Sequence, residues 1–275
     1  MKIKSISLKS FKRFTELRIQ NIPETAKLIV MAGPNGCGKS SIFDALKSWH
    51  RHWKGAGHNW DARYHHKYGI KEILDVNRAI KVDFHGTVPT DAEMKKKALY
   101  VRTAYRNDPQ FRLNRLDRMT SPLDEERFDK LIQNDIAVSS NYQRLVSKAF
   151  RELFVTLEEN TTIGEFRQQV IGDIKSSLQR VFPDLVLNDL GDPLDEGTFF
   201  FDKGVSQKFE YPNLSGGEKA AFDIILDLVV KRRDFNDTVF CIDEPDLHMN
   251  TRLQRDLLQE MNIRSDRGRV FTIDK

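Results

Sequence analysis

Residues 33–41 read GPNGCGKSS, and the residues immediately before them, 27–32, read KLIVMA. The nine residues fit the pattern G-x-x-x-x-G-K-[ST] of a phosphate-binding loop. Four residues occupy its fixed positions: Gly33, Gly38, Lys39 and Ser40. The apolar run LIVM predicts a buried strand, after which the chain has to turn sharply. Glycine permits this turn because it accepts positive φ angles and lets a phosphate approach the backbone closely.

A helix is predicted directly after the loop, ending near Lys47, with Ile42, Phe43 and Leu46 on one face. Its N-terminus would add partial positive charge beneath bound phosphates. The pattern assigns the Lys39 ammonium to the β- and γ-phosphates and the hydroxyl of the following serine to Mg²⁺. An ordinary glycine turn before a helix is the alternative, but strand, loop and helix occur in the required order.

The composition limits the class of protein. The 275 residues permit one or two domains, and 39% hydrophobic with 31% charged residues indicates a soluble globular chain. No apolar run is long enough to span a bilayer, and the basic N-terminus lacks the apolar core of a signal peptide. Cys37 and Cys241 suggest no disulfide framework, which predicts a cytoplasmic protein. A net charge of +4 permits a nucleic-acid partner without requiring one.

A second motif, LSGGE, occupies residues 214–218 and precedes an apolar, helix-like run. Ser215 and Glu218 have the spacing of a capping box. Gly216 and Gly217 in the first turn would leave backbone N–H groups exposed, so this helix end could receive an anion. A well-capped core helix is the alternative interpretation.

A third motif, VFCIDEP, occupies residues 239–245. Its four apolar residues predict a buried strand that ends in two carboxylates. Asp243 could hold Mg²⁺ through water, and Glu244 could polarise an attacking water, which are two groups that phosphoryl transfer requires. A strand ending in an acidic turn is the alternative.

In this order the three motifs resemble the Walker A, signature and Walker B motifs of ABC-type ATPases. The resemblance implies an α/β fold, a P-loop NTPase of ABC type with a mixed sheet and an inserted helical lobe, which binds ATP and Mg²⁺. It implies that the nucleotide is bound by Gly33, Pro34, Asn35, Gly36, Cys37, Gly38, Lys39, Ser40 and Ser41. Glu244 would be the catalytic base, and Ser40 and Asp243 would support the metal.

The same resemblance implies a homodimer. Heads of this class pair face to face, so that the signature of one head, here Ser215, Gly216, Gly217 and Glu218, acts in trans on the nucleotide of the other.

The N-terminal segment MKIKSISLKSFKRFTELRI narrows the resemblance to heads of the SMC, RecF and OLD type, with Phe11, Lys12, Arg13 and Phe14 in the turn between two strands. The segment DEPDLHMN is similar to RecF/OLD-like AAA-type ATPases of DNA repair and phage defence. Asn250 stands where the D-loop aspartate is expected, and His248 is interpreted as a structural hydrogen-bond donor or a dimer contact.

The implied function is an ATP-driven dimer cycle coupled to DNA maintenance or anti-phage defence, with DNA or a separate effector protein as partner and no membrane. Two alternatives remain: a non-hydrolysing ATP sensor, and a transporter's nucleotide-binding subunit, which DEPDLH disfavours. A strand at 269–273 should be followed by a switch histidine, but Lys275 stands near that place. The chain is therefore expected to be truncated or altered there, or to hydrolyse ATP slowly.

The head is predicted to be discontinuous, at 1–50 and 195–275, with a mainly helical insert at 51–194. Within the insert, helices are predicted at 141–158 and 163–182, and their apolar stripes are interpreted as core. Strands are expected at 80–84, 98–104, 198–202 and 207–211. Gln110 is the candidate for a glutamine loop, and Gln143 is the alternative.

The stretch that begins at Trp49, WHRHWKGAGHNWDARYHHKYG, mixes aromatic, histidine and basic residues. A surface loop with partly buried aromatics is the favoured interpretation. The alternatives are a nucleic-acid contact through base stacking and a metal site, which would draw on His50, His52, His58, His65 and His66.

Overall fold

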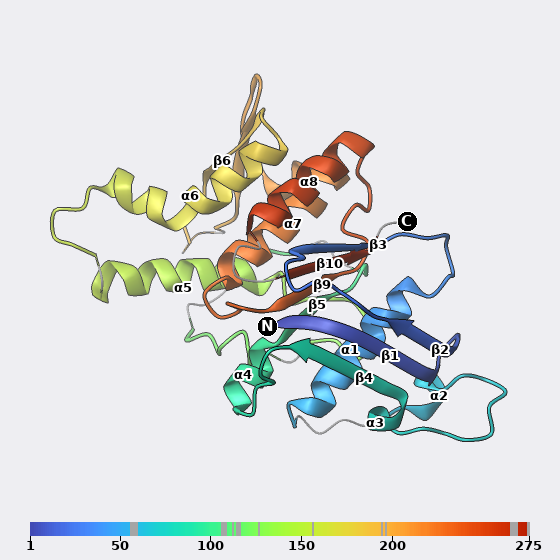
Figure 1. The fold of residues 1–275 in the computed structure, drawn as a ribbon. Helices are drawn as coiled ribbons and strands as arrows, with labels where there is room; N and C mark the ends of the chain where they lie inside the picture. Colours follow the sequence, from blue (N-terminus) through green and yellow to red (C-terminus); the bar gives the residue numbers. More distant parts are fainter. Residues whose placement is uncertain are drawn as a thin grey trace.

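A computed structural model of the protein describes residues 1–55, 60–105, 109–111, 113, 117–125, 127–155, 157–193, 195 and 197–264, and the backbone of 269–273. A parallel sheet lies at the centre, with α7 and α8 on one side and α1 on the other, while the hairpin of α5 and α6 projects from the head (Figure 1).

The central sheet has four parallel strands in the order β3-β10-β9-β5. Their bounds are Leu28–Met31 for β3, Arg269–Ile273 for β10, Val239–Ile242 for β9 and Leu99–Arg102 for β5. Every residue of β9 and β5 is buried, as expected for parallel strands covered on both faces.

A second sheet is antiparallel and has the order β2-β1-β4. Its strands are β1 at Lys2–Phe11, β2 at Phe14–Ile19 and β4 at Ile80–His85. Ile3, Ile6 and Leu8 of β1 are each 1% exposed and face the interior. Lysine and serine side chains alternate with them, so this sheet buries one face only.

Helix α1 extends over Lys39–Trp53 and is longer than predicted. Trp49 and Trp53 stack with ring centroids 4.9 Å apart, and both pack against Phe84 of β4. This packing adds a helical turn, so the start of the aromatic and histidine stretch is helix and not a surface loop. Three short helices follow: α2 at Ala62–His65, α3 at Val76–Ala79 and α4 at Ala92–Lys97.

The insert contains the two predicted helices, α5 at Ser140–Val155 and α6 at Ile163–Val181. The strand pairing does not follow the boundaries predicted for the insert. β4 and β5 lie inside 51–194 but pair with the head strands β1 and β9. A third sheet pairs β6, at Leu185–Asp189, with β7, at Phe200–Lys203, across the expected boundary at 195, and β8 at Ser206–Glu210 completes it.

The apolar stripes of α5 are core only in its first half. Tyr142, Leu145 and Val146 are buried, whereas Phe150 and Phe154 are 36% and 78% exposed. The second half of α5 lies in the projecting hairpin, beyond the helices that cover the first half (Figure 1). The prediction that the whole stripe is core is therefore wrong for these two phenylalanines.

The remaining helices complete the head: the 3-10 turn η1 at Tyr211–Asn213, α7 at Gly216–Lys231 and α8 at Thr251–Arg264. Both cysteines are free thiols, with Cys37 exposed and Cys241 buried. Among the helices that the structure describes, not one combines the length and the apolar character needed to cross a membrane.

Candidate nucleotide-binding site

The loop between β3 and α1 contains two glycines with left-handed backbone angles, Gly36 with φ 79° and Gly38 with φ 104°. A Cβ atom at Gly36 would lie 2.9 Å from the guanidinium of Arg13, and one at Gly38 would overlap the ring of Phe14. Both positions therefore favour glycine for conformation, and Gly38 requires it for space as well.

Positive charge gathers at the start of α1. The ammonium of Lys39 donates to the carbonyl oxygens of Gly33 and, at 3.3 Å, Pro34, so it lies within the loop. No side chain caps the helix at Gly38, and its first turn contains no acidic residue. The helix dipole and the lysine thus act together on any anion that the loop receives.

Ser40 and Asp243 are 203 positions apart in the sequence, and the Ser40 hydroxyl donates to Asp243 Oδ1 at 3.2 Å. Asp243 is 3% exposed, and its backbone N–H donates to the carbonyl oxygen of Arg102 at 3.0 Å. A hydroxyl and a carboxylate are oxygen ligands of the kind that Mg²⁺ prefers. The loop, the ammonium and these two oxygens fit a magnesium nucleotide.

Glu244 follows at the start of a tight turn and is half-buried. Its φ is 45°, and that of His248 is 68°. Left-handed angles cost a non-glycine residue about 1–2 kcal/mol, and such strain concentrates at functional sites. The Leu247 N–H donates to the Glu244 carbonyl oxygen at 3.2 Å and closes the turn.

Asn250, at the expected D-loop position, precedes α8. Its side-chain oxygen accepts from the backbone N–H of Leu253 at 3.0 Å. Asparagine and aspartate are equally good helix caps, so the departure from the family pattern keeps this local role.

The predicted capping box of LSGGE is present at the start of α7. The Ser215 hydroxyl accepts from the Glu218 N–H at 3.4 Å, and the Glu218 carboxylate accepts from the Ser215 N–H at 2.8 Å. Burial opposes ionisation of Glu218, but the Lys203 ammonium at 2.6 Å and the Ser215 donors hold its pKa below the usual range.

The two signature glycines differ in the space around them. A Cβ at Gly216 would have its nearest neighbour at 3.7 Å, in His248. A Cβ at Gly217 would approach the carbonyl oxygen of His248 to 3.0 Å and Leu253 to 3.4 Å. The signature thus packs against the turn after β9 of its own chain, which gives His248 a packing role.

The phosphate-binding loop and the signature are attached to opposite faces of the central sheet. Alternate residues of β5 and β9 point into two different cores. One core holds Leu99, Val101, Val239 and Cys241 together with Phe43 and Leu46 of α1. The other holds Tyr100, Phe240 and Ile242 together with Phe222 and Ile225 of α7.

Residues 28–271 match the family described as "AAA domain, putative AbiEii toxin, Type IV TA system". The matched region contains the loop, the signature and both carboxylates. The chain belongs to this family. It is therefore a P-loop ATPase domain, a class that binds ATP and Mg²⁺. A comparison with curated protein sequences finds no match.

Two solved structures with a similar fold are SMC heads. One is the SMC head bound to the C-winged helix domain of ScpA, with a TM-score of 0.51 and 14% identity. The other is an SMC head with an extended coiled coil bound to the C-terminal domain of ScpA derived from Pyrococcus furiosus, with a TM-score of 0.50 and 12% identity. Each alignment covers 99% of this chain and 89% of the other. The predicted α/β fold of ABC type is confirmed, but among the described residues the predicted mixed sheet is divided into a parallel and an antiparallel sheet.

In this AAA domain the turn between β1 and β2 contacts the phosphate-binding loop. Arg13 donates to the carbonyl oxygen of Gly36 at 2.5 Å, and Phe14 lies against Gly38. Lys12 forms an ion pair with the buried Asp44 of α1. Sequence reasoning used this turn only as a family signature. Its contact with the loop carries no local sequence signal, because it depends on how two separate segments meet.

A buried ionic cluster behind Asp243 was also missed. The Arg102 guanidinium donates to the carbonyl oxygen of Asp223 at 3.0 Å and to Asp227 Oδ2 at 3.3 Å. The Lys231 ammonium lies 2.8 Å from Asp227 Oδ1, and the Asn141 amide donates to the same oxygen at 3.0 Å. The cluster joins β5, α7 and α5 directly beneath the carboxyl end of the sheet.

The charges of this cluster depend on one another. Burial alone would raise the pKa of Asp227, but Lys231, Arg102 and Arg127 together lower it well below the usual range. Removing one partner would leave a buried charge without a counter-charge. The resulting loss of folding free energy is far larger than the net stabilisation that such a pair provides.

The two glutamine candidates lie on the α7 side of the sheet. Gln110 is exposed and precedes Phe111, whose ring packs edge-on against Phe199 and Tyr211. Gln143 lies on α5 and is half-buried. Either assignment to a glutamine loop stays a prediction. Lys275, at the expected place of the switch histidine, lies outside the described residues.

Two histidines of the aromatic stretch, His50 and His65, are buried and serve packing. His50 Nε2 donates to the Lys95 carbonyl oxygen at 2.8 Å. His65 stacks on Phe11 and Trp60, with centroids 5.4 Å and 4.6 Å apart. Within the described part of the chain no cluster of metal-ligating side chains is found. His58 lies outside the described residues.

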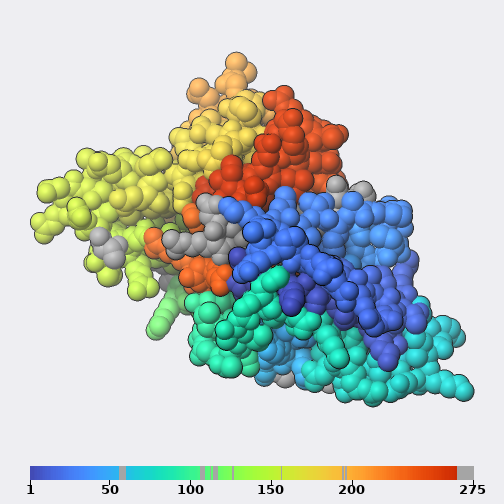
Figure 2. Space-filling model, viewed as in Figure 1, coloured from blue at the N-terminus to red at the C-terminus, as the bar shows by residue number. Residues whose placement is uncertain are grey.

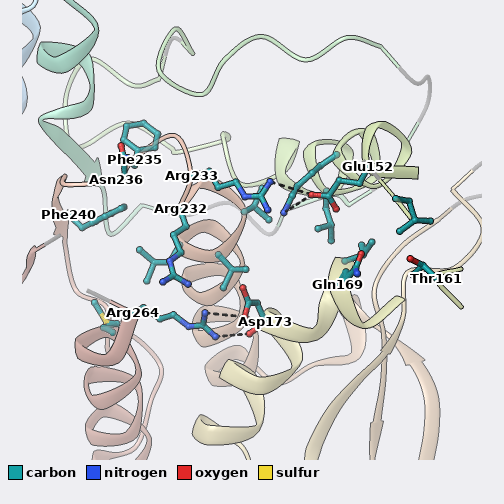
Figure 3. Close-up of a pocket in the computed structure, with 18 of the residues that line it drawn as sticks. Glu152, Thr161, Gln169, Asp173, Arg232, Arg233, Phe235, Asn236, Phe240 and Arg264 are labelled. Carbon is teal, nitrogen blue, oxygen red and sulfur yellow. Dashed lines mark hydrogen bonds and ion pairs between the residues drawn. The ribbon is translucent and has the colours of Figure 1, made fainter. Parts of the chain in front are cut away.

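A cavity of about 930 Å³ lies away from the phosphate-binding loop, between the hairpin of α5 and α6 and the C-terminal ends of α7 and α8 (Figure 3). Two ion pairs cross it: Arg233 with Glu152 at 3.4 Å, and Arg264 with Asp173 at 3.6 Å. They tie the insert to the head.

Proposed function

We propose that this AAA domain binds magnesium ATP on residues 33–41 and hydrolyses it. The observation that carries the proposal is the approach of the Ser40 hydroxyl to Asp243 Oδ1, 3.2 Å apart, beside a loop in which Gly36 and Gly38 have left-handed backbone angles. The phosphate-binding loop lies next to the carboxylates at the end of a buried strand. Together they supply the groups that phosphoryl transfer needs.

The chain's own residues have distinct roles. The Lys39 ammonium and the N-terminus of α1 neutralise charge on the β- and γ-phosphates. Ser40 and Asp243 would hold Mg²⁺, which would supply positive charge to the phosphates. Glu244 accepts the proton of the attacking water, and it stands in a left-handed backbone conformation directly after Asp243. These assignments and those of Pro34, Asn35, Cys37 and Ser41 rest on position and geometry.

The signature acts in trans in a homodimer around ATP. Support comes from the attachment of α1 and α7 to opposite faces of the sheet. A signature attached to the face opposite the loop favours capping of a nucleotide on another protomer, and a two-fold pair would satisfy both sites at once. ATP then closes the dimer and hydrolysis opens it.

The cycle serves DNA maintenance or anti-phage defence in the cytoplasm. The family description names a toxin of a type IV toxin–antitoxin system, and the similar SMC heads are bound to domains of a second protein, ScpA. These names support a separate effector protein as partner. Because a fold does not determine function, this part of the proposal rests on relatives.

Steady-state ATP hydrolysis by the chain, beside Glu244→Gln, tests the proposal. We expect turnover that falls by about 10²–10⁴-fold in the variant, the range for loss of a general base, while labelled ATP still binds. Glu210→Gln, an exposed carboxylate on β8, is the matched control and should leave turnover unchanged. ATP binding without turnover in the wild type would favour a non-hydrolysing sensor. Turnover that survives Glu244→Gln would exclude Glu244 as the base.

A further inference from the structure

The outer face of the antiparallel sheet β2-β1-β4 is a basic feature that the nucleotide site does not use. The inner face packs on α1 through Ile3, Ile6 and Leu8. The outer face is turned to solvent, and in Figure 2 the blue atoms of β1 and β2 and the teal atoms of β4 form a continuous surface. The nucleotide site is on the α1 side of this sheet.

This outer face is hollowed into a cleft of about 640 Å³. Four cations line it: Lys9, Arg18, Arg78 and Lys81. Glu16 is the one carboxylate among the lining residues. The side-chain amides of Gln20 and Asn77 complete the polar lining, so nearly every polar group there can donate to a phosphate oxygen.

Strand register determines where the cations lie. Ser7 of β1 is paired with Arg18 of β2 on one side and with Lys81 of β4 on the other. Neighbouring strands are about 4.8 Å apart, so the backbones of Arg18 and Lys81 lie about 10 Å apart on either side of Ser7. Lys9 lies about 7 Å from Ser7 along β1. A triangle of this size faces successive phosphates of a polymer and is too wide to close on one small anion.

The cluster is not explained by folding. Lys9 and Lys81 are exposed, and no hydrogen bond or ion pair joins either ammonium to another described residue. Arg18 pairs with Glu16 and Arg78 with Glu72, but all four side chains are between 57% and 61% exposed. Exposed ion pairs contribute little to the stability of a fold, so these two pairs do not account for the cluster.

We propose that this basic cleft, formed by Lys9, Arg18, Arg78 and Lys81, binds the phosphate backbone of double-stranded DNA. The choice of DNA as the polyanion rests on the proposed function, whereas the position of the cleft rests on register, exposure and charge. Contacts of this kind are independent of base sequence, because they reach only phosphate oxygens.

The test is binding of a short labelled DNA duplex, by fluorescence anisotropy, across a range of salt concentrations. The variant carries Lys9→Gln, Arg18→Gln and Lys81→Gln together. Each phosphate contact contributes about 0.9 to the slope of log K against log salt, so the triple variant should lose about 2.7 of slope. Near 0.1 M salt its affinity should fall on the order of 10²-fold.

The matched control removes three exposed cations elsewhere, by Arg151→Gln, Arg167→Gln and Arg232→Gln on the helical lobe and the end of α7. It has the same net charge as the cleft variant but should keep the wild-type slope. Melting temperature and ATP hydrolysis without DNA should match the wild type in both variants, because none of the six residues belongs to the ATP site.

Equal slopes for the cleft variant and the wild type would overturn the inference and leave the proposed ATPase intact. Equal losses in the cleft and control variants would also overturn it, since net charge would then account for binding. A wild-type protein that does not bind the duplex would overturn both the cleft and the link to DNA, while the Glu244→Gln assay, performed without DNA, would still decide hydrolysis.

Discussion

Gly38 and Gly55 stand at the two ends of α1, and both have left-handed angles, with φ 104° and 77°. Their surroundings differ. A Cβ at Gly38 would fall on the ring of Phe14, whereas a Cβ at Gly55 would meet no atom within 4 Å. The first glycine is therefore required by conformation and by packing, and the second by conformation alone.

We predict that Gly38→Ala lowers the free energy of unfolding more than Gly55→Ala. Both variants force alanine into a left-handed conformation, at about 1–2 kcal/mol. Gly38→Ala must in addition displace the Phe14 ring, which adds about 1–3 kcal/mol of overpacking. Urea denaturation of the two variants measures the difference. Equal losses would show that Phe14 moves aside freely, and Phe14→Leu combined with Gly38→Ala should recover part of the loss.

At the scale of elements, α1 carries two histidines in contrasting surroundings. His50 is buried and donates to Lys95 of α4, whereas His52, two residues on, is exposed. Burial lowers the pKa of His50 from 6.5 to about 3. In the folded protein this side chain therefore stays neutral at pH values where the unfolded chain takes up a proton.

The sign of the pH dependence follows from linkage. Between pH 6.5 and 3 the unfolded state binds more protons at His50. The free energy of unfolding should therefore fall with acidification, by up to about 1.4 kcal/mol per pH unit from this residue. His50→Gln keeps an N–H donor and should flatten the dependence, as followed by denaturation between pH 7 and 5. His52→Gln is the control. A slope insensitive to His50→Gln would contradict the assignment.

Elements whose signals lie within a few residues were predictable from the sequence. The loop at 33–41, the capping box of Ser215 and Glu218, and the buried strand before Asp243 each depend on local spacing. The end of α1 could not be predicted from local spacing, because the helix is extended to Trp53 by stacking of that side chain on Trp49 and Phe84.

Contacts between segments that are far apart in the chain produce no recognisable pattern in the sequence. Arg13 reaches Gly36 and Arg102 reaches Asp227 only after the sheets have assembled. The range predicted for the insert includes β4 and β5 for the same reason: each has an ordinary strand pattern, and only pairing with β1 and β9 assigns it to the head.

At the scale of the whole molecule, the loop and the signature lie on opposite faces of the sheet. If the signature acts in trans, a variant with a defective loop and a variant with a defective signature should restore ATP hydrolysis when they are mixed. Lys39→Ala disables the loop and leaves the signature intact. Gly216→Glu disables the signature but should fold normally, since the nearest neighbour of a Cβ there is at 3.7 Å and a carboxylate suits a helix N-terminus.

Each variant alone should be inactive. In an equal mixture about half of the dimers are mixed and one of their two sites is intact, so about a quarter of wild-type turnover should return. ATP hydrolysis across mixing ratios measures this. A mixture as inactive as its components would contradict action in trans, and hydrolysis by Gly216→Glu alone would remove the signature from the reaction.

The order β3-β10-β9-β5 also has a consequence for biosynthesis. β3 and β9 are not paired with each other, and β10 joins them. About 240 residues separate β3 from β10, so at ribosomal speeds β3 waits roughly 10–50 s for its neighbour. On the nascent chain the strand before the loop lacks its only paired neighbour among the described strands until residues 269–273 emerge, and only contacts such as that of Arg13 can hold the loop until then. Nucleotide binding would then report that translation has passed this point, and unfinished chains would compete poorly for ATP.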